Sequence, residues 1–154
     1  MSNLSQTVAD GLAQIYRDFG QRVRTLSEQV SEEQFWTNPF SHGNSMGHLV
    51  LHLTGNLSYY IGAEIARSGY VRDREREFTD AQPPSKEEAL QRLEAAVQLV
   101  IRTLEAQTPD TWSLAYSVTG VESWTNRFQV FLRCAAHFQS HLGQMIYLVK
   151  AQSK

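Results

Sequence analysis

Four stretches of the 154-residue sequence repeat apolar residues at intervals of three and four positions. This spacing gathers apolar side chains on one side of an α-helix, and that side must then pack against other elements. We expect long helices over about 4–30, from 44 or 45 to 67, over 85–108, and from 125 or 126 to 150. Long helices with shorter connections are typical of a helical bundle, so the sequence predicts an all-α fold.

Capping and breaking residues set the expected helix boundaries. A capping box, in which serine is followed three residues later by glutamine or glutamate, occurs at 31–34 and 85–88. The first predicts a short additional turn, and the second predicts the start of the third long helix. Gly69 ends the second helix, and Thr108 with Pro109 ends the third. The mixed-charge run 72–80 has no periodicity, so we expect a solvated loop there.

Composition favours one folded domain and argues against several partners. Hydrophobic residues make up 42% and charged residues 19% of the chain, so we expect a single domain over 1–154. A formal net charge of -2 leaves no basic field for phosphates, and nucleic acid is not an expected partner. No apolar run approaches the roughly 20 residues that a membrane span needs, so we expect no membrane partner and a cytoplasmic location.

Four of the five histidines form two pairs, each with a spacing of four residues. His48 and His52 lie on the second expected helix, and His137 and His141 lie on the fourth. Side chains four apart share a helical face, with Cβ atoms roughly 6 Å apart, so two rings can close on one metal ion. A third imidazole from a facing helix would complete the pocket. The alternative is that these are ordinary, partly buried histidines that make hydrogen bonds.

Acidic residues are too far from both pairs for a di-iron bundle site, which needs Glu-x-x-His motifs and additional inward glutamates. Glu64 is the first acid on the second helix, three turns beyond His52, and the fourth helix has no acid after Glu122. A mononuclear, histidine-rich site is therefore the better prediction. No acid beside these histidines can be assigned as a general base.

Three segments resemble DinB-like proteins. Residues 44–56, NSMGHLVLHLTGN, resemble the second helix of that superfamily, and residues 134–144 resemble its last helix. Residues 69–78 resemble the charged connector of one DinB-like subfamily of uncharacterised proteins. The likeness spans nearly the whole chain. It implies an up-and-down four-helix bundle, usually a homodimer, with a three-histidine site whose remaining positions are filled by water.

The resemblance also assigns the ligands. His52 fits the family pattern His-Leu-x-Gly-Asn, and the last helix supplies His137 and His141. His48 stands where relatives carry other large residues, so it is the less favoured choice for the first ligand. Otherwise it is either a proton-transfer group behind the ligands or a packed, hydrogen-bonded ring. We expect one divalent ion, zinc or nickel first, with iron or manganese as alternatives.

The function implied by this likeness is a metal-dependent reaction. Some superfamily members are transferases or isomerases that use a thiol such as bacillithiol, mycothiol or glutathione, so we expect an S-transferase or a hydrolase. Such an ion lowers the pKa of a bound water or thiol. His48, Tyr59 and Gln144 are candidates, from helical position alone, for stabilising charge near the ion. The alternative is a non-catalytic bundle, stapled by metal or serving as a dimeric interaction module.

Four further side chains are given structural roles. Cys134 lies one turn before His137 and is expected to be a small buried hydrophobe rather than a ligand. The three tryptophans, in the connecting segments, are expected to cover the ends of the core: Trp36, Trp112 and Trp124.

Overall fold

The computed structural model describes residues 3–153, and the regular elements within this range are helical. The long helices are α1 (Leu4–Ser27), α3 (Met46–Leu57), α5 (Lys86–Glu105) and α6 (Arg127–Gln152). Two short helices are α2 (Glu32–Trp36) and α4 (Arg76–Thr79), and a π-helical segment, η1 (Ser58–Ala63), continues α3. The predicted all-α fold is confirmed. None of the helices in this range has the length and apolar character that crossing a bilayer requires.

Side-chain caps begin the long helices. The Asn3 and Asn126 side chains accept the backbone N–H of the residue three positions on, at 2.9 and 3.0 Å. Ser45 and Ser85 do the same at 3.1 and 3.2 Å. Each cap satisfies an amide that has no partner inside its helix, which stabilises the helix by about 1 kcal/mol. The predicted capping box at Ser31 is also present, and it starts α2.

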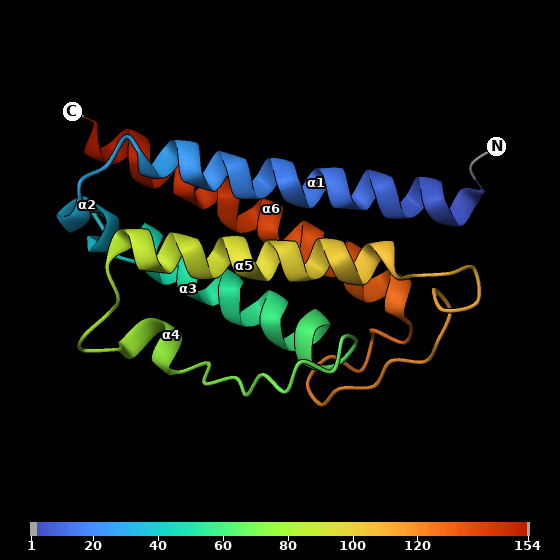
Figure 1. Ribbon diagram of the computed structural model, residues 1–154. Helices are drawn as coiled ribbons and strands as arrows, with labels where there is room; N and C mark the ends of the chain where they lie inside the picture. Colours follow the sequence, from blue (N-terminus) through green and yellow to red (C-terminus); the bar gives the residue numbers. More distant parts are fainter. Residues whose placement is uncertain (1–2, 154) are drawn as a thin grey trace.

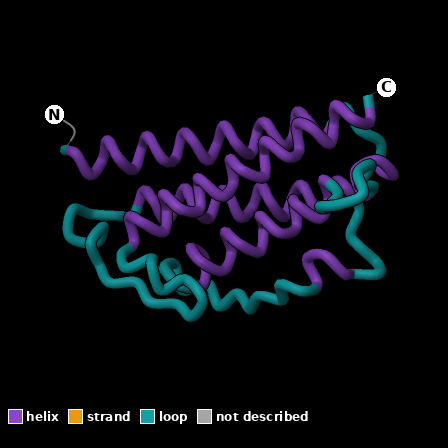
Figure 2. Tube along the Cα trace, turned by 180° about the vertical axis from the view of Figure 1, so that it is seen from behind, coloured by secondary structure: helices purple, strands orange, loops and turns teal. Residues whose placement is uncertain are grey.

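The four long helices lie side by side, with α5 and α6 each packed against both α1 and α3 (Figure 1). Helices α1 and α6 run in one direction, and α3 and α5 run in the other (Figure 1). The up-and-down alternation implied by the resemblance is therefore wrong for α3 and α5. Helices α3 and α5 run in the same direction because the connection 64–85 returns along the helices before α5 begins (Figures 1 and 2). A short loop would have forced these two helices to be antiparallel.

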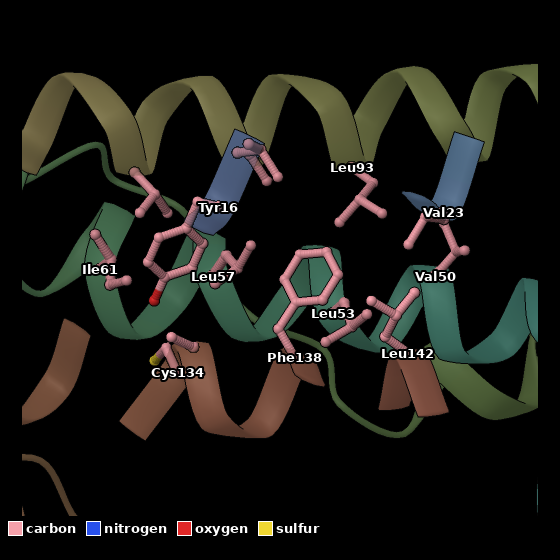
Figure 3. Packing of buried hydrophobic residues seen from close by; sticks show 14 of the residues in the cluster. Tyr16, Val23, Val50, Leu53, Leu57, Ile61, Leu93, Cys134, Phe138 and Leu142 are labelled. Atoms are coloured by element: carbon pink, nitrogen blue, oxygen red, sulfur yellow. The ribbon is translucent and has the colours of Figure 1, made fainter. Parts of the chain in front are cut away.

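The core lies between the long helices and is apolar with few exceptions (Figure 3). Tyr16 is fully buried, and its hydroxyl donates to the carbonyl of Phe131 at 2.7 Å, which ties α1 to α6. Cys134 is also fully buried, and burial raises the pKa of its thiol to about 12. The expectation that Cys134 acts as a small hydrophobe is confirmed.

Tryptophans pack against this core from the connecting segments. The ring of Trp36 lies over Gly47, where a Cβ atom would come within 2.4 Å of it. Trp112 donates from Nε1 to Ser5 at 2.7 Å. The ring of Trp124 meets that of Tyr60, on η1, with centroids 5.0 Å apart. The predicted role of these residues in covering the core agrees with these contacts.

Candidate metal centre

Three imidazole rings from two helices converge at one point beside the core. His52 comes from α3, and His137 and His141 come from α6. Nε2 of His137 lies 3.1 Å from Nε2 of His52 and 3.0 Å from Nε2 of His141. Two nitrogen atoms bound to one ion at about 2.1 Å each lie roughly 3 to 3.4 Å apart. The three rings are therefore close enough to hold a metal ion.

Hydrogen bonds at the outer nitrogen atoms determine the tautomer of two of the three rings. Nδ1 of His52 lies 2.8 Å from Oε2 of Glu77, and Nδ1 of His141 lies 2.7 Å from Oε1 of Gln144. Carboxylate and amide oxygens only accept hydrogen bonds, so in a neutral ring each Nδ1 carries the proton. The lone pairs on Nε2 then point toward the cluster. Nδ1 of His137 is buried and has no hydrogen-bond partner among residues 3–153.

The electrostatics of the cluster favour neutral rings. Burial, together with the neighbouring His141 and His52, lowers the pKa of His137 to about 4. Burial also lowers the pKa of His141. Neutral imidazole is the form that binds a metal ion, so these two rings need not lose a proton to do so near pH 7.

The charged connection contributes an ion pair to the site. Glu77 and Arg72 have side chains only 6% and 9% exposed, joined by Nε–Oε1 and Nη2–Oε2 bonds of 2.7 and 3.0 Å. Burial raises the pKa of Glu77, but hydrogen bonds from His52 and Arg72 outweigh it and lower the pKa overall. The predicted solvated loop over 72–80 is therefore wrong where these residues lie. The sequence identified no acid beside the histidines that could be assigned as a general base, whereas the structure places Glu77 beside His52.

The sequence matches the family described as "Protein of unknown function (DUF1572)" over residues 4–154. The chain belongs to the DUF1572 family. No curated protein matches it in sequence. Because the description of the DUF1572 family names no activity, the chemistry of this member has to be inferred from its side chains.

Of the three other candidate residues in this DUF1572 protein, one contacts the histidine cluster and two pack against other side chains. Gln144 touches the cluster through His141. His48 instead faces Ser45, with Nδ1 2.8 Å from the hydroxyl oxygen, and its ring meets that of Trp36 edge-on. This agrees with the packed-ring alternative for His48. Tyr59 is half-buried on η1 and packs against the neighbouring Tyr60 ring, with centroids 5.1 Å apart.

Glu77 was missed because it lies outside the helical periodicity on which the sequence interpretation depends. One signal was present in the pattern His52-Leu-Thr-Gly55, since a glycine on the buried side of a helix leaves room for another group. A Cβ atom on Gly55 would lie 2.0 Å from Oε1 of Glu77. The glycine indicates a close approach, but it does not say which segment of the chain approaches.

Proposed function

We propose that the protein binds one divalent metal ion through Nε2 of His52, His137 and His141. The convergence of these three atoms is the observation that carries the proposal. In two of the rings, His52 and His141, the proton is held on the outer nitrogen, so Nε2 is free to bind the ion. An all-imidazole set suits zinc or nickel, our first expectations, with iron or manganese as alternatives.

We further propose that the fold is a DinB-like four-helix bundle that forms a single domain. The four long helices pack around one core, and the proposed ligands lie on the second and last of these helices, as the resemblance implies. A cytoplasmic homodimer is part of the same proposal. Light scattering tests the dimer, and a monomer at all concentrations would contradict it.

The proposed activity is a metal-dependent S-transferase or hydrolase reaction. Three protein ligands are typical of catalytic zinc sites, which keep a position for water or substrate. An ion there lowers the pKa of a bound water or of a thiol such as bacillithiol. The chain's own contribution is to fix the ligand rings: Gln144 holds His141, and Glu77 holds His52.

A non-catalytic role for the ion is the second candidate, because the cluster joins α3 to α6. A structural ion would be needed for folding, whereas a catalytic one leaves a folded protein after its removal. The apolar core includes side chains of α1 and α5, which supply none of the three rings. This distribution favours a metal-free protein that stays folded. Circular dichroism after chelation separates the two roles.

Metal content per chain tests the binding proposal. Elemental analysis should find about one ion per chain in protein purified without an affinity tag. His52→Ala, His137→Ala and His141→Ala should each lose the ion. His48→Ala is the matched control, one turn from His52 on the same helix, and should retain it. Equal loading in all of these variants would overturn the site.

A further inference from the structure

We propose that Glu77 is the positioning residue for the ligand ring of His52, and that Gly55 provides the space in which its carboxylate lies. The connection 64–85 would then be part of the metal site and more than a link between α3 and α5. This inference rests on the proposed metal binding.

The contact between Glu77 and His52 has the geometry that orients a ligand ring. The His52 Nδ1–H donates to Oε2 of Glu77 at 2.8 Å, while Nε2 of the same ring faces the other two histidines. Both side chains are buried, with 8% and 6% exposed. A carboxylate at the outer nitrogen fixes the tautomer and the ring orientation, and it raises the basicity of the ligand atom.

Arg72 holds the carboxylate in this position. Its guanidinium makes two hydrogen bonds to Glu77, one to each oxygen, and lies over the ring of Tyr60 at 5.6 Å from the centroid. This planar arrangement restrains the rotation of the carboxylate, which a single lysine ammonium would not do. The ring of Phe78, the next residue after Glu77, packs on His52 with centroids 5.1 Å apart. Two residues of the connection therefore restrain the same ligand.

Gly55 is the part of α3 that makes this contact sterically feasible. It lies three residues after His52, and a Cβ atom there would meet Oε1 of Glu77 at 2.0 Å and Cδ at 2.8 Å. Any other residue type would push the carboxylate away. Glycine inside a helix is less favourable than alanine by about 1 kcal/mol, so the position is poor for helix stability but suited to this contact.

A purely structural role would use the same contacts to anchor the connection to α3. The two roles differ in what they affect. An anchor changes the stability of the metal-free protein, whereas a positioning residue also changes metal affinity and the tautomer of His52. Metal affinity and the tautomer of His52 are therefore the quantities that distinguish the two roles.

The first experiment compares Glu77→Ala and Glu77→Gln with Glu75→Gln, a control in the same connection at an exposed position. Zinc and nickel affinities are measured by competition with a chromophoric chelator. Glu77→Ala should weaken binding by about 10- to 100-fold. Glu77→Gln should weaken metal binding less, because an amide oxygen still accepts the hydrogen bond from His52. Glu75→Gln should bind metal as tightly as wild type.

Nitrogen-15 NMR of the histidine rings supplies the readout that does not need metal. Metal-free wild type should show His52 as the Nδ1–H tautomer, and Glu77→Ala should lose this preference. If wild type binds metal and Glu77→Ala binds within about twofold with an unchanged tautomer, the inference is overturned. If wild type binds no metal, the proposed function fails, and the tautomer alone decides whether Glu77 positions His52.

The second experiment tests the role of Gly55 with a double-mutant cycle. Gly55→Ala should weaken metal binding about as much as Glu77→Ala, although alanine favours the helix. The double variant should bind metal no more weakly than either single variant, because the carboxylate is already displaced or absent in each of them. Gly11→Ala is the control on α1, where a Cβ atom would meet nothing within 4 Å in the described part of the chain apart from its own helix. Losses that add in the double variant would contradict this mechanism.

Discussion

Replacing Arg72 by methionine should destabilise the metal-free protein strongly, because it leaves Glu77 buried without its main cationic partner. Breaking a buried ion pair by removing one partner destabilises by about 3–5 kcal/mol. Glu77 keeps the hydrogen bond from His52, and it also lines a cleft between the connection, α3 and α5. We therefore expect the lower end of this range, about 3 kcal/mol.

The double variant Arg72→Met with Glu77→Gln should recover most of this loss, because no charge is then left buried. Urea unfolding of chelator-treated protein measures both changes, and the double-mutant cycle gives their coupling. A loss of 3 kcal/mol corresponds to a melting temperature lower by about 6–12 °C for a chain of this size. If Arg72→Met costs under about 1 kcal/mol, or if the double variant is less stable than the single one, the pair is not a buried charge pair in solution.

Three further predictions concern the core and the titrating groups. Tyr16→Phe should lower the free energy of unfolding by about 1 kcal/mol, as measured in urea, and leave metal content unchanged, since it removes one buried hydrogen bond. The metal-free protein should lose stability as the pH falls from about 6.5 toward about 4. In this range His137 is protonated in the unfolded state but stays neutral in the folded state, so protonation favours unfolding. Urea midpoints across this range test the trend, and His137→Ala should show a flatter profile. The thiol of Cys134, fully buried and with its pKa raised to about 12, should resist an aromatic disulfide reagent at pH 8 until the protein is unfolded. Rapid labelling of the folded protein would contradict that burial.

Local patterns were sufficient for the helices and for the histidine cluster. The periodicity and the capping residues depend only on neighbours in sequence, so Ser85 marks a helix start correctly, and Ser45 is the cap of the two residues, 44 and 45, expected for α3. The pair His137 and His141 shares a face because of the helical repeat, and packing of α3 on α6 brings His52 to it. These features follow from sequence spacing and from the need to bury apolar faces.

The connection between α3 and α5 could not be read in this way. Isolated from the fold, a run of alternating acids and bases predicts exposure, because the cost of burying a charge is compensated only by partners that the sequence does not identify. Arg72 and Glu77 compensate each other, and His52 completes the set from 25 residues away in the chain. The direction of α5 was missed for a related reason, since the path of the connection depends on where these partners dock.

The spread of the three rings along the chain has a consequence for when the site can exist. His52 and His137 are separated by 85 positions, so the ligand set is complete only when α6 has been synthesised and packed against α3. A nascent chain that ends before α6 carries one ring of the three and has little to retain an ion. Metal acquisition should therefore follow folding of the finished polypeptide, and the supply of ions during translation should not affect the folding yield.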